Sequence, residues 1–318
     1  MIGTDINKAI DILMKGDLIG LPTETVYGLA GNAINSHAIS KIFSVKNRPS
    51  FNPLIIHLSH TEKISDYAYI DHPTLQDLAD KFMPGPLTLI LNKKENVPHI
   101  VTAGSNKVAV RIPSHDLALE VLSCIDFPLA APSANPFGYI SPTTPLHVLK
   151  QLGNSISYIL DGGACNIGIE STIVGIEENE IVVYRKGGLS IEQIEKVVGR
   201  VHVNTHSTSN PIAPGMLTNH YAPSLPLYLG DFQEMAIELK DKRCVALCFS
   251  ESIAFENIKK CFVLSPDKNF KEAAANLFTF LREIDEMEEI DAIIAELLPE
   301  KDLGRAINDR LRRASINK

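Results

Sequence analysis

The feature that most constrains this chain is a dense run of polar side chains where an apolar strand ends. The apolar run from residue 18 to residue 21 predicts a strand that stops at Pro22, and P-T-E-T-V-Y-G-L-A begins there. Two threonine hydroxyls, including that of Thr25, and the Glu24 carboxylate therefore follow the strand at once. Because α/β folds build their sites at strand ends, this stretch predicts a functional site.

Two cations come next. Apolar residues at helical spacing between positions 39 and 43 predict a helix that ends near Asn47, ahead of a proline that disfavours the α region. Lys46 and Arg48 then lie at the C-terminal end of that helix. The apolar run 54–58 follows and predicts a buried strand.

His57 interrupts that strand, so one supersecondary unit collects hydroxyls, a carboxylate, two cations, an amide and an imidazole. Taken singly, threonines at a strand end are common turn formers, and cations after a helix complement its dipole. Their density inside an apolar region favours a site, because a core has no structural use for so many polar groups.

The net charge of −8 is spread evenly along the 318 residues. Residues 1–200 carry 16 Lys and Arg against 20 Asp and Glu, and residues 201–318 carry 14 against 18, so each part has a net charge of −4. This balance argues against broad binding of nucleic acid or anionic membranes through bulk charge. It leaves room for a local basic pocket.

The five cysteines show neither metal-ligand spacing nor a disulfide framework, and they predict reduced thiols. The N-terminus has no apolar signal region, and no apolar run approaches the length of a membrane span. We therefore expect a cytoplasmic protein that is neither exported by a standard signal nor embedded in a membrane.

Three further strands are predicted beside polar residues. Alternation over 108–112 predicts a strand with Arg111 on its polar face, and the apolar run 128–131 leads into P-S-A-N-P. The segment I-E-S-T-I-V-G-I, residues 169–176, predicts a strand with Ser171 near its centre.

Small polar groups gather after these strands as well. Ser133, Asn135 and Ser141 lie in proline-rich segments, which normally form loops. Arg185 precedes a glycine turn and the capping box Ser190-x-x-Gln193, which predicts the start of a helix. This places Arg185 well for contact with an anion.

From residue 225 onward, apolar runs alternate with helical periodicity. They predict strands at 225–229, 244–249, 262–264 and 292–295, with a helix between each pair and one after the last. Alternating strands and helices predict a small parallel-sheet domain.

Residues 203–223 lack periodicity and predict an interdomain linker. The linker contains P-G-M-L-T-N-H-Y-A-P, in which Met216, His220 and Tyr221 are unsuited to a solvated spacer. One hypothesis makes this segment a lid over the site of the first domain. The alternative is permanent packing of Tyr221 and Met216 at the domain interface, and partial proteolysis with and without ligand separates the two.

Standard nucleotide and nucleophile motifs are absent. The sequence has no G-x-x-x-x-G-K-[ST] phosphate loop, no G-x-G-x-x-G fingerprint, and no evident Ser-His-Asp or Cys-His arrangement. What remains is a set of basic side chains among hydroxyls and amides: Lys46, Arg48, His57, Lys107, Arg111 and Arg185. Such a set suits an anionic substrate bound by charge, without a protein nucleophile.

At these residues the chain resembles the threonylcarbamoyl-AMP synthase family, the YrdC-like proteins, in their two-domain form. The resemblance covers essentially the whole chain and rests on P-T-E-T-V-Y-G-L-A, K-N-R-P-x-x-N-P-L-I-x-H, P-G-P-L-T, V-A-V-R-I-P, A-A-P-S-A-N, E-S-T-I-V and H-Y-A-P. It implies an α/β fold with a YrdC-like twisted mixed-sheet domain at 1–203 and a linker or lid at 204–223. A smaller Rossmann-like parallel-sheet domain is expected at 224–318.

The resemblance also implies a reaction. L-Threonine, bicarbonate and ATP, with Mg²⁺, give threonylcarbamoyl-AMP and pyrophosphate for threonylcarbamoyladenosine modification of tRNA. The tRNA is then a partner only indirectly, through a downstream transferase. The residue types agree, since cations stabilise charge that develops on phosphate and the threonine carbamate must be kept from water.

Residue roles are implied position by position. Around threonine the resemblance places Thr25, His57, Arg111, Ala131, Ser133 and Ser171. Around ATP it places Lys46, Arg48, Asn52, Lys107, Ser133, Asn135, Ser141, Arg185 and Tyr221. The cations Lys46, Arg48 and Arg185 are expected to converge on the phosphates as catalytic residues, and no residue is assigned to Mg²⁺. Lys107 stands where relatives often carry Thr, so its contact with ATP is either electrostatic or absent.

A competing hypothesis makes the first domain an RNA-binding module without catalysis. A cationic groove would hold the RNA, and the second domain would dock a protein. The even charge and the scarcity of aromatic stacking pairs disfavour this hypothesis. Pyrophosphate release that requires both threonine and bicarbonate separates the two.

Overall fold

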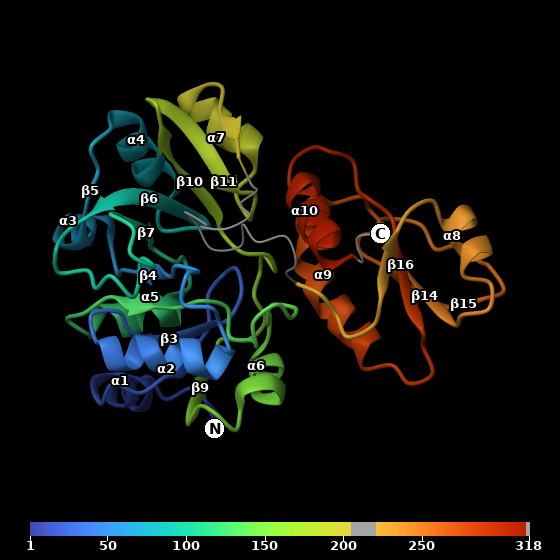
Figure 1. Ribbon diagram of the computed structural model, residues 1–318, viewed down its shortest axis with the longest axis horizontal. Coiled ribbons are helices and arrows are strands. Elements are labelled where there is room, and N and C mark those ends of the chain that lie inside the picture. Colours follow the sequence, from blue (N-terminus) through green and yellow to red (C-terminus); the bar gives the residue numbers. More distant parts are fainter. Residues whose placement is uncertain (205–220, 316–318) are drawn as a thin grey trace.

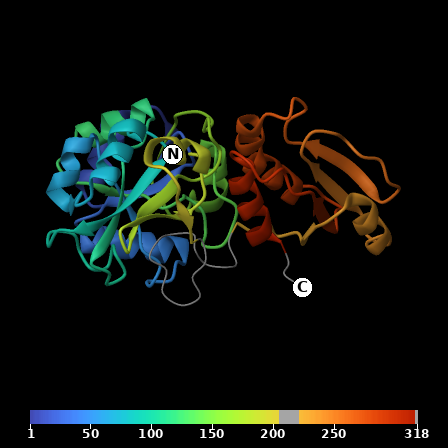
Figure 2. The same cartoon turned by 90° about the horizontal axis from the view of Figure 1, so that it is seen from above.

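The computed structural model describes residues 1–204 and 221–315, and there the chain folds around two separate sheets. Figure 1 shows the two sheets side by side along the longest axis, and the view from above in Figure 2 shows the same separation. The predicted α/β class, with a large mixed sheet followed by a smaller parallel sheet, is confirmed. Most of the predicted lid segment lies outside the described residues.

The first sheet contains both parallel and antiparallel pairs. In the described ranges its strands are β1 (Ile2–Gly3), β2 (Ile19–Leu21), β3 (Gly28–Asn32), β4 (Ile55–His57), β5 (Ala68–Tyr69), β6 (Leu87–Lys93), β7 (Lys107–Arg111), β8 (Leu129–Ala130), β9 (Tyr158–Leu160), β10 (Thr172–Glu177), β11 (Glu180–Arg185) and β12 (His202–Val203). Their order is β1-β9-β2-β3-β8-β4-β7-β6-β10-β11-β12, and β5 pairs with β6 outside this path. Strands that are distant in sequence are therefore neighbours.

The helices of this part cover the sheet. They are α1 (Ile6–Met14), α2 (Ser36–Lys46), the short 3-10 helix η1 (Thr61–Lys63), α3 (Ile64–Tyr67), α4 (Pro73–Phe82), α5 (Asp116–Ser123), α6 (Pro145–Leu152) and α7 (Ile191–Val198). The predicted capping box at the start of α7 is present, with Ser190 and Gln193 bonded reciprocally.

Helix α2 ends where the sequence predicted. The side chain of Asn35 caps its start, and Asn47 closes it in the left-handed conformation with φ of 50°. Asparagine tolerates that conformation better than most residues do. Lys46 thus lies in the last turn, and Arg48 directly follows the cap residue.

Strand pairing brings the polar strand ends together. Strands β4 and β7 are parallel, and His57 is in register with Arg111. Strand β10 is parallel to β6 and begins at Thr172, so the predicted strand over 169–176 was wrong at its start, and Ser171 precedes the strand. Ile169 instead packs into a cluster that belongs mainly to the second sheet.

A buried apolar core supports this arrangement. Leu29, Ile56, Leu89 and Val110 from four strands belong to one cluster with residues of α2 and α4. Burial of a side chain of this size stabilises the fold by about 1.5–3 kcal/mol.

The second sheet is entirely parallel within the described residues. Its strands are β13 (Leu227–Leu229), β14 (Cys244–Cys248), β15 (Ile258–Val263) and β16 (Ala292–Ala295), in the order β13-β16-β14-β15. Its helices are α8 (Phe232–Glu238), α9 (Phe270–Asp285) and α10 (Gly304–Ala314).

One predicted helix of this part is wrong. Residues 249–257, between β14 and β15, form no helix. The segment is shorter than a usual crossover helix with its loops.

Helices α9 and α10 face the first domain (Figure 1). Val26, Ile140 and Ile169 of the first domain share one apolar cluster with Leu277 and Phe278 of α9. Polar contacts surround the cluster, such as Lys150 Nζ to Glu286 Oε1 at 2.6 Å and the hydroxyls of Thr143 and Thr279 at 3.1 Å. The two parts are therefore packed together through a shared core.

Gly168 shows how close this packing is. Its φ is +78°, and a Cβ atom there would lie 2.5 Å from the Cα of Ala275 in α9. Only glycine fits both the backbone conformation and the approach. No helix of residues 1–204 and 221–315 is long and apolar enough to cross a membrane.

Candidate active site

A polar cavity opens where the strand ends of the first sheet meet the edge of the second domain. Its lining residues are Thr25, Val26, Arg48, Pro53, Leu54, Ile55, His57, Arg111, Ala131, Pro132, Ser133, Glu170, Arg185 and Tyr221. Most of the predicted site residues are thus at or beside one cavity.

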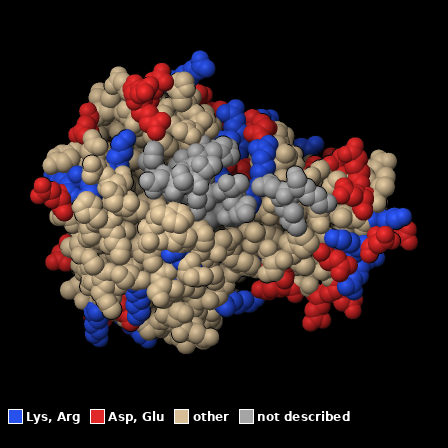
Figure 3. All heavy atoms as spheres, viewed as in Figure 1, with Lys and Arg blue, Asp and Glu red and all other residues tan. Residues whose placement is uncertain are grey.

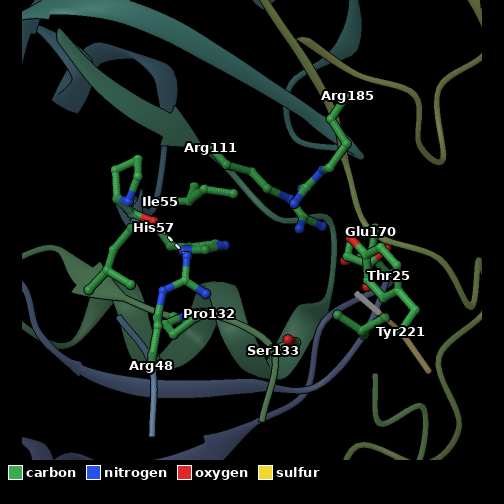
Figure 4. A pocket seen from close by; sticks show the side chains of 14 residues that line it. Thr25, Arg48, Ile55, His57, Arg111, Pro132, Ser133, Glu170, Arg185 and Tyr221 are labelled. Atoms are coloured by element: carbon green, nitrogen blue, oxygen red, sulfur yellow. Dashed lines mark hydrogen bonds between the residues drawn. The ribbon is translucent and has the colours of Figure 1, made fainter. Parts of the chain in front are cut away.

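Three guanidinium groups point into this cavity from different segments (Figure 4). Arg48, Arg111 and Arg185 are each between 4% and 8% exposed. Burial lowers the pKa of Arg48 and of Arg185, because the charged form is removed from water. Such a concentration of buried positive charge favours an anionic ligand.

Each of two arginines is held by its own neighbour. Arg48 donates from Nε to the Asn52 carbonyl at 3.1 Å and from Nη2 to the Asn52 Oδ1 at 2.7 Å. Arg185 donates from Nε to the Ser171 carbonyl and from Nη2 to the Ser171 hydroxyl, both at 3.0 Å. Asn52 and Ser171 therefore fix the orientation of the guanidinium groups.

Arg111 is paired with a carboxylate. Its Nη2 lies 2.7 Å from Glu24 Oε1, and its Nε donates to the Gly85 carbonyl at 3.3 Å. Glu24 comes from the P-T-E-T segment that the sequence singled out, and it is 6% exposed.

His57 is a neutral imidazole at the floor of the cavity. It is 2% exposed, and its Nδ1 has no hydrogen-bond partner among the described residues. Burial, reinforced by the charge of Arg111, lowers the pKa of His57 to about 3. At neutral pH the ring therefore offers hydrogen bonds without positive charge.

Glu170 and Tyr221 form the wall next to the second domain. The Glu170 carboxylate accepts from the Ser141 hydroxyl at 2.5 Å and from Arg310 Nε at 2.9 Å. Burial alone would raise the pKa of Glu170, but Arg310, Arg185 and the Ser141 hydrogen bond hold it below its ordinary value. Glu170 is thus ionised at neutral pH.

Lys46 is buried beside the cavity but does not line it. Its Nζ donates to the carbonyls of Ser133 and Asn135. Burial and the neighbouring Arg48 lower the pKa of Lys46 well below its usual value. Asn135 in turn donates from Nδ2 to the carbonyls of Pro136 and Tyr139, both at 2.8 Å. These residues shape the loop that presents Ser133.

Lys107 is not brought to the cavity. It is at the start of β7, whereas Arg111 is at the end, and four strand residues span about 13 Å. Its Nζ donates to the Ile176 carbonyl at 3.2 Å, and it lines a separate hollow with Tyr69 and Asp71. Of the two alternatives for Lys107, this geometry favours the absence of a contact with ATP.

The sequence reasoning assigned no role to Glu24, Glu170 or Arg310. Glu170 carries a signal, because an acidic residue directly precedes Ser171 in an apolar run. Arg310 carries none, since charged residues occur throughout its helix.

The pocket offers no evident cage for a metal ion. Residues 1–204 and 221–315 contain no group of three or more His, Cys, Asp and Glu that could hold one. The two carboxylates of this region, Glu24 and Glu170, are both engaged by guanidinium groups.

Family comparisons cover both parts of the chain. A family described as telomere recombination, which groups the Sua5, YciO and YrdC proteins, matches residues 11–187. A second family, described as threonylcarbamoyl-AMP synthase, C-terminal domain, matches residues 189–315.

Individual relatives agree along nearly the full length. A threonylcarbamoyl-AMP synthase of Pyrococcus abyssi is 39% identical over 98% of this chain and 94% of its own. One of Bacillus subtilis is 38% identical over 98% of this chain and 92% of its own.

Solved structures agree as well. The crystal structure of P. abyssi Sua5 in complex with L-threonine superposes with a TM-score of 0.90 at 39% identity, covering 98% of this chain and 94% of that one. The chain therefore belongs to the threonylcarbamoyl-AMP synthase family.

Proposed function

We propose that this chain converts L-threonine, bicarbonate and ATP into threonylcarbamoyl-AMP and pyrophosphate. The observation that carries the proposal is one cavity lined by three buried guanidinium groups and a neutral imidazole. This cavity lies in a chain that aligns over 98% of its length with proteins named threonylcarbamoyl-AMP synthase.

We place threonine at the end of the cavity lined by β4 and β7. Arg111 would bind the carboxylate, since a guanidinium forms charge-assisted hydrogen bonds with carboxylates. His57 would donate or accept a hydrogen bond without adding charge. Thr25, Ala131, Ser133 and Ser171 complete the proposed threonine set. Support comes from the relative whose structure holds L-threonine.

The nucleotide is placed toward the second domain. Arg48 and Arg185 would face its phosphates, with Ser133 between the two substrates and Tyr221 at the wall. Lys46, Asn52, Asn135 and Ser141 would act by holding these groups in place, because each is hydrogen-bonded to a lining residue or to its loop. Lys107 is not included in the proposed nucleotide site, because it lies at the opposite end of β7 from Arg111.

The chemistry follows from the charges. Threonine's amine adds to bicarbonate with loss of water and gives a carbamate. The carbamate oxygen then attacks the α-phosphorus of ATP, and the bond to pyrophosphate breaks. Arg48 and Arg185 would stabilise the charge that develops on the phosphates, and the enclosed cavity would limit hydrolysis. No covalent intermediate with the protein is required.

Mg²⁺ has no evident protein ligands here. The pocket carboxylates are neutralised by arginines, so the described residues do not fit a magnesium cage. We propose that Mg²⁺ arrives on the phosphates of ATP.

The product would pass to a downstream transferase, so that tRNA is an indirect partner. We place the activity in the cytoplasm, because the five cysteines are free thiols and the chain carries no disulfide. We propose that the catalytic domain ends at residue 203 and that the linker ends at residue 223.

The comparisons support synthesis and give no support to an RNA-binding module. On the face shown in Figure 3, Lys and Arg are interspersed with Asp and Glu and form no broad basic surface. RNA binding through bulk charge needs such a surface.

Pyrophosphate release tests the function. The protein is mixed with ATP and Mg²⁺, and threonine, bicarbonate or both are omitted in turn. We expect pyrophosphate only with the complete mixture, together with threonylcarbamoyl-AMP detected by mass spectrometry. Equal release without threonine would contradict the proposal.

A further inference from the structure

The guanidinium group of Arg310 reaches the candidate active site from the second domain. Arg310 is in the last helix, α10, and it is 1% exposed. Its Nε and Nη2 both lie 2.9 Å from Glu170 Oε2, and its Nη1 donates to the Lys186 carbonyl at 2.8 Å. It also bonds Asp309 of its own helix.

The partners of Arg310 outside its helix are at the cavity. Glu170 lines it, and Lys186 directly follows Arg185, which lines it as well. The ring of Tyr221, also a lining residue, lies 5.0 Å from the Arg310 guanidinium. Arg310 itself is not a lining residue, so it acts on the cavity through these groups.

The charges explain why such a contact matters. Glu170 is a carboxylate in a pocket proposed for a triphosphate, and a carboxylate that is not neutralised repels phosphate. Arg185 is also close enough to influence the charge of Glu170. Without Arg310, Arg185 is a remaining cation that holds the pKa of Glu170 down, and it is also the group proposed to face the phosphates.

We propose that Arg310 is a positioning residue for the nucleotide: it neutralises and holds Glu170, so that Glu170 does not compete with the phosphates for Arg185. This inference rests on the proposed function. It assigns the second domain a part in nucleotide binding.

Binding measurements test the inference. Affinities for a non-hydrolysable ATP analogue and for L-threonine are measured by calorimetry on the full chain and on Arg310→Met. We expect nucleotide affinity to fall about tenfold to hundredfold, the range for a lost charged hydrogen bond. Threonine affinity should change less than about threefold, because Arg111 is not among the partners of Arg310.

Arg305→Met is the matched control. Arg305 is on the same helix and reaches the first domain at Glu192, with Nη2 3.4 Å from Oε1. Its substitution should leave both affinities unchanged. Equal loss of both affinities in Arg310→Met would mean that Arg310 only docks the domains, and the inference would be overturned.

A second variant separates positioning from stability. Glu170→Gln in the Arg310→Met background removes the charge that Arg310 compensates, so nucleotide affinity should recover toward the wild-type value. Arg310→Lys keeps the charge but loses the planar fork, and it should give intermediate affinity. A double variant that binds nucleotide no better than Arg310→Met would overturn the inference.

The outcomes distinguish the two proposals. If the wild-type chain does not bind the ATP analogue, the proposed function fails and this inference fails with it. If the wild-type chain binds the analogue and Arg310→Met binds it equally well, only the role of Arg310 is refuted.

Discussion

Arg111 Nη2 and Glu24 Oε1 lie 2.7 Å apart in the interior of the first domain, where both side chains are almost fully buried. A buried ion pair of this kind is strongly destabilising to break, because the remaining charge loses its compensation. Its position at the proposed threonine site ties the stability of the fold to the substrate pocket.

Arg111→Ala should weaken threonine binding much more than nucleotide binding. A charged hydrogen bond contributes about 1.5–3 kcal/mol, so threonine affinity measured by calorimetry should fall roughly tenfold to 150-fold. Arg243→Ala, which alters an exposed cation of the second domain, is the control. Unchanged threonine affinity would remove Arg111 from this role.

Glu24→Gln should destabilise the protein by about 3–5 kcal/mol, because it leaves the Arg111 charge buried without its partner. Urea denaturation gives the free energy of unfolding. Glu286→Gln breaks the exposed pair with Lys150 and should cost at most about 1 kcal/mol. An equal loss of unfolding free energy in the two variants would show that the buried pair contributes no more to stability than the exposed pair.

Arg48→Ala and Arg185→Ala should slow pyrophosphate release at saturating threonine. Removal of one donor to developing charge costs roughly 3–4 kcal/mol at most, which corresponds to a 10²–10³-fold loss in rate. A coupled pyrophosphate assay measures this. Rates within threefold of wild type for both variants would exclude the two arginines from phosphate stabilisation.

Lys46→Met should weaken the binding of both substrates. Lys46 does not line the cavity but donates hydrogen bonds to the carbonyls of Ser133 and Asn135. Calorimetry with threonine and with an ATP analogue provides the comparison. Lys41→Met on the same helix, which only breaks a partly exposed pair with Asp17, should alter neither affinity. Loss confined to the nucleotide would indicate direct phosphate contact by Lys46.

Stability should fall as the pH drops from about 6.5 toward 3. The pKa of His57 is lowered to about 3, so the unfolded chain binds the proton first and acid favours unfolding. His57 contributes a slope of up to about 1.4 kcal/mol per pH unit. His147, whose pKa burial lowers to about 4, acts in the same direction.

His57→Asn should make this slope shallower between pH 6 and pH 4, as measured by urea denaturation at several pH values. His60 is exposed, and His60→Asn should leave the slope as in the wild type. Identical slopes for wild type and His57→Asn would show that the buried His57 ring does not contribute to the pH dependence of stability.

The sequence predicted those parts of the site that lie next to each other along the chain or at strand ends. Thr25, Arg48, His57 and Arg111 could be assigned because strand periodicity and a proline fix where their segments end. Lys107 precedes the predicted strand 108–112 and begins β7 in the structure, so it lies at the opposite end of the strand from Arg111 and lines another hollow.

What could not be predicted depends on packing between distant segments. Glu170 and Arg310 are 140 residues apart, and their contact exists only because α10 docks against the first domain. No local pattern records that docking. The helix expected between the predicted strands 244–249 and 262–264 was wrong for a different reason, since β15 already begins at Ile258 and a short connection joins it to β14.

The apolar cluster shared by Val26, Ile140, Ile169 and the helix α9 has a consequence for protein engineering. A fragment that ends after the first sheet would expose these side chains as a hydrophobic patch. It would aggregate unless these side chains were replaced by polar residues. Val26 directly follows the P-T-E-T segment and lines the cavity, so its substitution would also change the candidate active site. The chain is thus poorly suited to trimming, although it contains two sheets.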